Sequence, residues 1–142
     1  MSAEIIVGVH EGPPEVEVSI ILPIFNELGH LEKEIFRVRE AMDASGRSYE
    51  IIVVDDGSTD GSGEVLRDLD GIRLLQFETN RGSGSARKYG TLASRGSIVI
   101  WTDVDMTYPN DEMPELVEQL GGWDQVVGAR RTEEGTVKFL RK

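Results

Sequence analysis

Asp103 and Asp105 directly follow an apolar run, and they are the residues in this chain best suited to chemistry. In an extended segment, residues two apart share a face, so both carboxylates can reach one point. Carboxylate oxygens suit Mg²⁺ or Mn²⁺, which keep several waters and take further ligands from substrate phosphates. An Asp-x-Asp pair is also common in solvated acidic turns, so the pair alone does not establish a metal site.

A calcium loop of the EF-hand kind does not fit the same segment. Counting from Asp103, Tyr108 stands where the sharp-turn glycine belongs, and Pro114 stands where the last glutamate belongs.

Asp55 and Asp56 follow a second apolar run, residues 51–54. A carboxylate at a strand end can accept hydrogen bonds from ribose hydroxyls or from a base N–H. The same segment, continuing to Ser62, is explained equally well as ordinary turn and helix-cap chemistry. Both interpretations stay open on this segment alone.

Three further segments follow apolar runs. Pro23, Phe25 and Glu27 come after residues 18–22, where a plain helix cap explains them better than a binding role does when the segment is taken alone. Gly82 opens a helix and lets backbone N–H groups approach an anion, or it permits close packing. Arg130 follows residues 126–128 and either pairs with a diphosphate or lies on the surface.

Strand-like and helix-like runs alternate along the chain. We expect strands over residues 18–22, 51–54, 72–77, 98–101 and 124–127. We expect helices from a cap at Asn26 onward, over 65–69, over 83–94 and from 109–111 onward. The first helix has apolar residues three or four apart, at Leu28, Leu31, Ile35, Val38 and Met42. Alternation of this kind predicts an open, mostly parallel α/β sheet, whose ligands bind beyond the carboxyl ends of the strands.

Composition narrows the class of function. The 142 residues carry a formal net charge of −11, which argues against a nucleic-acid partner. The chain has no cysteine, so disulfides and cysteine zinc sites are excluded. No apolar run approaches the ~20 residues that a membrane helix needs. We interpret residues 1–17 as a flexible lead-in and residues 18–142 as one domain.

The motifs in chain order resemble glycosyltransferase family 2 of the GT-A fold, a Rossmann-like α/β fold with helices on both faces of the sheet. They read LPIFNE, VVDDGSTDGS, NRGSGSARKYG, TDVDMTYP and VVGAR. The resemblance is greatest to the polyprenyl- and dolichol-phosphate sugar transferases. It assigns Pro23, Phe25, Glu27, Gly82 and Val104 to the nucleotide-sugar pocket. It implies that Asp56 binds the base or the ribose, with Asp55 as the alternate. It further implies that Asp103 and Asp105 bind Mg²⁺ or Mn²⁺ and that Arg130 binds the phosphates.

The implied reaction is inverting transfer of a sugar from a UDP- or GDP-sugar to an acceptor, a polyprenyl phosphate in the most similar members. A lipid phosphate is already anionic, so no general base is required, and none is identified in this chain. The resemblance implies a cytoplasmic location, at the cytoplasmic face of the membrane for a lipid acceptor. Because family members place the acceptor part further along, we expect this chain to be a donor-binding fragment with weak or absent transfer.

Two other functions compete with this one. A non-catalytic nucleotide-sugar-binding module of a larger assembly would need the same donor site. A sugar nucleotidyltransferase would need a glycine-rich phosphate loop after the first strand, where this chain has Pro23 to Glu27.

Overall fold

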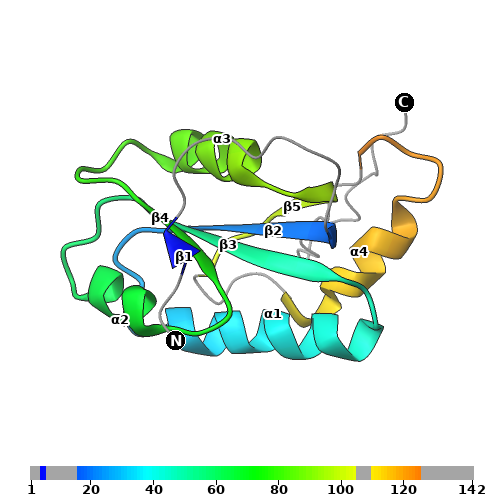
Figure 1. Cartoon of the computed structure of the whole chain (residues 1–142), viewed down its shortest axis with the longest axis horizontal. Coiled ribbons are helices and arrows are strands. Elements are labelled where there is room, and N and C mark those ends of the chain that lie inside the picture. The colour runs from blue at the N-terminus through cyan, green and yellow to red at the C-terminus, as the bar shows by residue number, and fades with distance from the viewer. Residues whose placement is uncertain (1–3, 6–15, 105–109, 126–142) are drawn as a thin grey trace, which may run out of the picture.

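The computed structural model describes residues 4–5, 16–104 and 110–125 and shows alternating strands and helices (Figure 1). The strands are β1 (Glu4–Ile5), β2 (Val16–Ile24), β3 (Tyr49–Asp55), β4 (Arg73–Gln76) and β5 (Gly96–Trp101). The helices are α1 (Leu31–Ser45), α2 (Ser62–Asp68), α3 (Ser83–Ala93) and α4 (Met113–Gln119), the last preceded by a 3₁₀ turn, η1 (Asn110–Glu112).

The strands form one parallel sheet in the order β1-β4-β3-β2-β5. The chain steps from β2 to β3 to β4 in one direction, then crosses back to the free side of β2 to form β5. Right-handed crossovers in opposite directions place their helices on opposite faces, and α3 lies across the sheet from α1 and α2 (Figure 1). The expected open parallel sheet with helices on both faces is confirmed.

Apolar side chains of the sheet pack in two layers. On one face, residues of β2 and β3 pack with α1, α2 and α4, through Leu31, Ile35, Leu66, Met113 and others. On the other face, Ile21, Ile52 and Val54 pack with Phe77 and with Ala86 and Ala93 of α3. Both faces of β2 and β3 are therefore buried, which explains their continuous apolar runs.

Pro23 does not end its strand, contrary to the sequence-based expectation. Pairing with β3 continues through Pro23 to Ile24, whereas pairing with β5 ends at Ile21 and Trp101. Ile21 accepts the last hydrogen bond from the β5 side, from the Thr102 amide at 3.2 Å. Backbone groups of alternate residues face alternate neighbours, so Pro23 lacks the N–H that would continue this ladder. Proline here ends the pairing with one neighbour and not the strand.

The first helix begins later than the sequence predicts. Helix α1 starts at Leu31, and Asn26 lies outside it with φ 54°. The side-chain oxygen of Asn26 accepts a hydrogen bond from the Thr59 amide at 2.8 Å and so caps no helix. Leu28, which was expected on the apolar face, is exposed. The cap prediction is wrong because the partner of Asn26 lies 33 residues away.

Smaller differences concern short or terminal elements. Within the expected lead-in, Glu4–Ile5 pairs with β4, and β2 already begins at Val16. The fourth helix opens with the 3₁₀ turn at Asn110. Of the expected strand over residues 124–127, Asp124 and Gln125 are not in a strand, and the other two lie outside the described residues.

Glu50 organises a polar cluster at the amino edge of the sheet. Its carboxylate accepts hydrogen bonds from the Ser19 hydroxyl and the Arg95 amide, both at 2.6 Å, and from Arg73 Nη1 at 2.8 Å. Burial alone would raise the pKa of Glu50, but these bonds outweigh burial and lower the pKa below its ordinary value of 4.5. The cluster joins β2, β3, β4 and the start of β5.

Replacing Glu50 with glutamine is expected to lower the free energy of unfolding by about 3 kcal/mol at pH 7, because the buried Arg73 loses its ion pair with the Glu50 carboxylate. A folded-state pKa below the unfolded value stabilises the fold above about pH 4.5, and this stabilisation is lost as pH falls through the folded-state value. The acid-side loss of stability should therefore be shallower in Glu50→Gln. Urea unfolding at pH 7, 4 and 3 measures both effects.

Glu40→Gln on the exposed side of α1 is the matched control for this substitution. It should change the free energy of unfolding by less than about 0.5 kcal/mol. Equal stability of Glu50→Gln and the control at pH 7 would contradict the role given to Glu50.

Candidate functional site

The loops after β2, β3, β4 and β5 all leave the sheet at its carboxyl edge, because the strands are parallel. The strand order reverses between β2 and β5, since β2 leads on to β3 on one side whereas β5 lies on the other. Open α/β sheets bind ligands beside such a reversal. The candidate site is therefore built from residues 25–30, 56–61, 77–82 and 102–104.

The loops after β2 and β3 are joined by their polar groups. The Asn26 amide donates to Ser58 Oγ at 3.0 Å, and the Leu28 amide donates to Asp60 Oδ2 at 3.1 Å. A hydrogen bond from the Ser62 hydroxyl is the main cause that lowers the pKa of Asp60. Asp60 is therefore an ionised acceptor that holds the two loops together.

Asp55 and Asp56 are both buried, and each uses both of its carboxylate oxygens within the protein. Asp56 accepts from the backbone amides of Arg81 at 2.7 Å and Gly82 at 2.9 Å. Asp55 accepts from the Ser58 amide and from Gln76 Nε2, each at 3.1 Å. A carboxylate oxygen has a second lone pair, so these bonds leave capacity for a ligand. The structure gives Asp56 in particular the task of holding the loop after β4.

Gly57 lets the loop after β4 come close to the loop after β3, and Gly82 lets the chain turn into α3. Gly57 has φ 75°, and a Cβ there would lie 2.5 Å from the carbonyl carbon of Thr79. Gly82 has φ 96° and immediately precedes α3. The guanidinium of Arg81, which precedes Gly82, lies 4.6 Å from the centre of the Phe77 ring. Close backbone approach therefore accounts for Gly57, whereas a positive φ accounts for Gly82, which leaves the amino end of α3 at the carboxyl edge.

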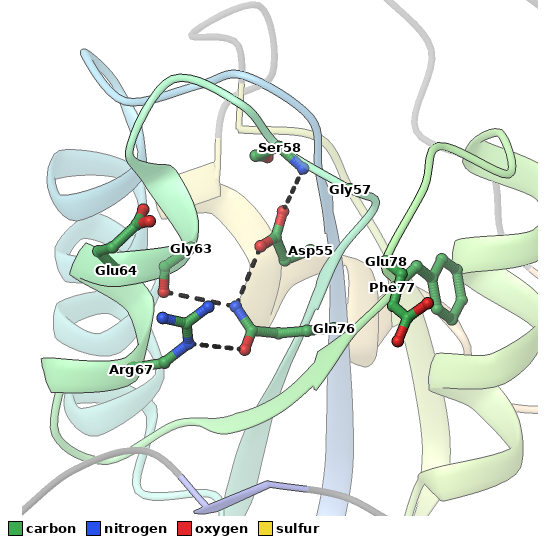
Figure 2. Close-up of a pocket in the computed structure, with 9 residues that line it drawn as sticks. All are labelled: Asp55, Gly57, Ser58, Gly63, Glu64, Arg67, Gln76, Phe77 and Glu78. Carbon is green, nitrogen blue, oxygen red and sulfur yellow. Dashed lines mark hydrogen bonds between the residues drawn. The ribbon is translucent and has the colours of Figure 1, made fainter.

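A polar pocket of about 320 Å³ lies between α2 and the ends of β3 and β4 (Figure 2). Gln76 is at its centre and bonds Asp55, the Gly63 carbonyl at 3.4 Å and Arg67 Nε at 3.0 Å. Asp55 faces this pocket, whereas Asp56 faces the loop after β4. The two aspartates therefore serve different surroundings, although they are adjacent in the sequence.

The predicted residues of the loop after β2 are only partly exposed to ligand. Phe25 is exposed, Pro23 is half-buried within β2, and the carbonyl oxygen of Glu27 accepts from the amides of His30 and Leu31, both at 2.9 Å. Phe25 thus presents an aromatic ring at the carboxyl edge, suited to stacking on a base.

Asp103 follows β5 directly and is the metal-ligand candidate that the structure describes. Its side chain is 31% exposed, and its Oδ1 lies 3.5 Å from Arg87 Nη2 of α3. Val104 is buried in the core, so its side chain is not available to a ligand. Asp105 and Arg130 lie outside the described residues.

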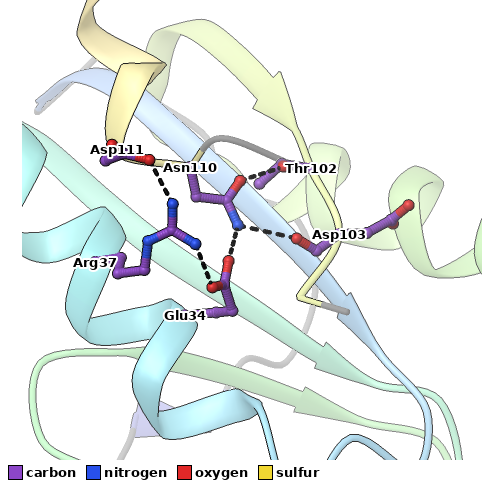
Figure 3. Close-up of polar contacts among 6 residues, drawn as sticks. All are labelled: Glu34, Arg37, Thr102, Asp103, Asn110 and Asp111. Atoms are coloured by element: carbon purple, nitrogen blue, oxygen red, sulfur yellow. Dashed lines mark hydrogen bonds and ion pairs between the residues drawn. The ribbon is translucent and has the colours of Figure 1, made fainter. Parts of the chain in front are cut away.

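A polar network with a buried centre, which the sequence-based reasoning missed, supports this turn (Figure 3). Asn110 joins Thr102 and Asp103 to Glu34 of α1, and Arg37 joins Glu34 to Asp111. The hydrogen bond to Glu34 is the main cause that raises the pKa of Arg37. A bond from its own backbone, followed by the bond from Arg37, lowers the pKa of Asp111. A signal for this network was present in the sequence, because Glu34 occupies a position of the apolar stripe of its helix.

Among the described residues, no group of three or more histidine, aspartate or glutamate side chains could hold a metal ion. A complete protein cage is not what Mg²⁺ requires, because it binds through one or two carboxylates together with substrate phosphates. Asp103 fits that donor chemistry, since it is an accessible carboxylate next to the reversal of strand order. Within the same residues, no helix has the length and apolar character needed to span a membrane.

Comparisons with known proteins place this arrangement in a family. A solved structure with the same fold is that of S. aureus TarS 1-349, with a TM-score of 0.54 and 24% sequence identity over 75% of this chain and 32% of that chain. The likeness confirms the expected GT-A fold.

Similar curated relatives include two proteins named undecaprenyl-phosphate 4-deoxy-4-formamido-L-arabinose transferase. The one from Edwardsiella ictaluri (strain 93-146) is 37% identical over 130 residues, which are 88% of this chain and 40% of the relative. The one from Pseudomonas paraeruginosa (strain DSM 24068 / PA7) is 38% identical over 119 residues, which are 80% of this chain and 35% of the relative. The chain therefore spans 40% or less of the length of these two relatives.

The model of one family, described as glycosyl transferase family 2, matches residues 19–142. This match contains β2 from Ser19 onward, every later element to α4 and every loop of the carboxyl edge described above. The chain therefore belongs to glycosyltransferase family 2.

Proposed function

We propose that this chain forms the donor-binding part of an inverting glycosyltransferase that moves a sugar from a UDP- or GDP-sugar to a polyprenyl phosphate. The observation that carries the proposal is the position of Asp103, a partly exposed carboxylate beside the reversal of strand order in a family 2 domain. The names of the relatives support undecaprenyl phosphate as the class of acceptor.

In the proposed complex, the nucleoside lies across the loops after β2 and β3. Phe25 offers a ring for the base, and Asp55 or Asp56 accepts hydrogen bonds from the base or ribose. Because Asp56 also holds the amides of Arg81 and Gly82, it couples the nucleoside position to the loop that begins α3. The diphosphate then lies toward Asp103 and Asp105, with Arg130 as a further phosphate contact.

Asp103 and Asp105 would hold Mg²⁺ or Mn²⁺, which supplies Lewis-acid stabilisation of negative charge on the departing nucleoside diphosphate. An oxygen of the acceptor phosphate attacks C1 of the sugar as the bond from C1 to the diphosphate breaks, and the configuration at C1 inverts. The attacking oxygen is already anionic, so no proton has to be removed. The task of this domain is to orient the donor for that attack.

Asp103→Asn is expected to remove most of the metal-dependent part of nucleotide binding. We expect Mn²⁺ to tighten binding of the preferred nucleotide, UDP or GDP, and the substitution to weaken binding in Mn²⁺ by at least about tenfold, or about 1.4 kcal/mol. Binding without metal should change little. Calorimetric titration with UDP and with GDP, each with and without Mn²⁺, measures this.

Asp68→Asn at the exposed end of α2 is the matched control and should bind like the unchanged chain. The proposed metal site fails if Mn²⁺ leaves the affinity of the unchanged chain for both nucleotides the same. It fails equally if Asp103→Asn retains the full Mn²⁺ effect.

Asp56→Asn is expected to weaken nucleotide binding by about tenfold whether or not Mn²⁺ is present. Asparagine has one side-chain carbonyl oxygen, so the amide of either Arg81 or Gly82 loses its partner. The same calorimetric titrations separate this result from that of Asp103→Asn, which affects the metal-dependent part. Unchanged metal-free affinity in Asp56→Asn would contradict the nucleoside role, and a thermal melt of each variant checks that it is folded.

A further inference from the structure

Asn110 uses its side-chain amide to join three parts of the chain. Its oxygen accepts from Thr102 Oγ1 at 2.6 Å, and its Nδ2 donates to the Asp103 carbonyl at 3.0 Å and to Glu34 Oε2 (Figure 3). The orientation of the amide follows from its partners, because an ionised carboxylate and a carbonyl can only accept. Asn110 is 2% exposed, so both N–H groups and the oxygen are satisfied inside the protein.

The anchor of Asn110 is a fully buried carboxylate. Glu34 of α1 has no exposed surface, and its other oxygen accepts from Arg37 Nη1 at 2.7 Å. Burying the Glu34 carboxylate costs desolvation free energy, and its ion pair with the partly exposed Arg37 does little more than offset that cost. Stability of the fold is therefore a weak explanation for the buried position of Glu34. A better explanation is that Glu34 fixes the position of Asn110.

That position determines how the chain leaves β5. Asn110 bonds two consecutive residues, Thr102 and Asp103, and the Thr102 amide is also bonded to Ile21 of β2. The next side chain, Val104, is buried in the core. The backbone of Asp103 is thus held on both sides, while its carboxylate is directed to the partly exposed position near Arg87. The same bonds join the two ends of the segment that contains Asp105.

We propose that Asn110, anchored on Glu34, is a positioning residue for the donor site. It holds the Asp103 turn in the orientation in which its carboxylate receives the divalent cation and diphosphate of the donor. The inference rests on the proposed function. It adds that the affinity of the turn for metal and diphosphate is set from α1, through a side chain that itself touches neither ligand.

The test compares variants that break the hydrogen bonds between Asn110 and the Asp103 turn with variants that keep them. Asn110→Ala removes the hydrogen bonds to Thr102 and to Asp103. Thr102→Val removes the hydroxyl that donates to Asn110, with little change of shape. Thr102→Ser keeps the hydroxyl and serves as the rescue. Glu50→Gln is the stability control, because it weakens a polar cluster at the opposite edge of the sheet and has no contact with Asp103. All are titrated with UDP and GDP, with and without Mn²⁺, well below their melting temperatures.

We expect Asn110→Ala and Thr102→Val to reduce the tightening caused by Mn²⁺ by about tenfold, as substitutions next to metal ligands commonly do. Thr102→Ser and Glu50→Gln should retain the full tightening by Mn²⁺. The affinity for nucleotide without metal should be the same in all of these variants. In the metal-free chain, hydrogen exchange at residues 102–104 should also be faster in Asn110→Ala and unchanged in Glu50→Gln.

Three results would overturn the inference while the proposed metal site stands. They are a full Mn²⁺ effect in Asn110→Ala, equal losses in Thr102→Ser and Thr102→Val, or an equal loss in Glu50→Gln. The proposed function fails separately if Mn²⁺ does not tighten nucleotide binding in the unchanged chain, and the inference then fails with it. Because Thr102→Val keeps the shape of threonine and Thr102→Ser keeps its hydroxyl, this pair decides the matter even if Asn110→Ala does not fold.

Discussion

The parallel pairing of β2 with β3 on one side and with β5 on the other is the constraint from which the site follows. Parallel strands end at the same edge, so residues more than 70 positions apart in sequence come together there. The loops after β2 and β5 flank the reversal, and Pro23 ends the ladder between these strands while the ladder to β3 continues. The polar segments of the sequence become one site because the sheet places their ends together.

Two polar networks at opposite edges of the sheet have different consequences. At the amino edge, Glu50 bonds groups from neighbouring strands and the start of β5, so it stabilises the sheet without facing a ligand. At the carboxyl edge, Glu34 and Asn110 bond the turn that carries Asp103. Desolvating Glu34 in the core is costly, and the cost is offset only if its partners keep one arrangement. A network of this kind restricts the turn to a single geometry, which a site for a doubly charged ligand requires.

Local pattern was sufficient to predict most of the fold, because buried parallel strands are continuous apolar runs and helices show apolar spacing of three or four. The strand end at Trp101 was predicted correctly for this reason, and the end at Asp55 to within one residue. The cap predicted at Asn26 was wrong and the role of Asn110 was missed because the hydrogen-bond partners of both residues are distant in sequence. Asn26 bonds Thr59, and Asn110 bonds Glu34, 76 positions away. Spacing within one segment contains no information on such pairs. The short strand Glu4–Ile5 depends on backbone pairing with β4, and two residues are too few for a periodic signal.

The charge of the protein bears on why a cation belongs in the proposed site. A chain with a formal net charge of −11 repels a diphosphate, and Asp103 adds a further negative charge at the position where the diphosphate would lie. Two arginines near this edge already have partners, since Arg87 lies 3.5 Å from Asp103 and Arg81 packs on Phe77. A divalent ion between Asp103 and the diphosphate makes both anions its ligands and so converts their repulsion into binding. On this argument the acidic turn favours donor binding only when its carboxylate is held at the right position, which is the task we assign to Asn110.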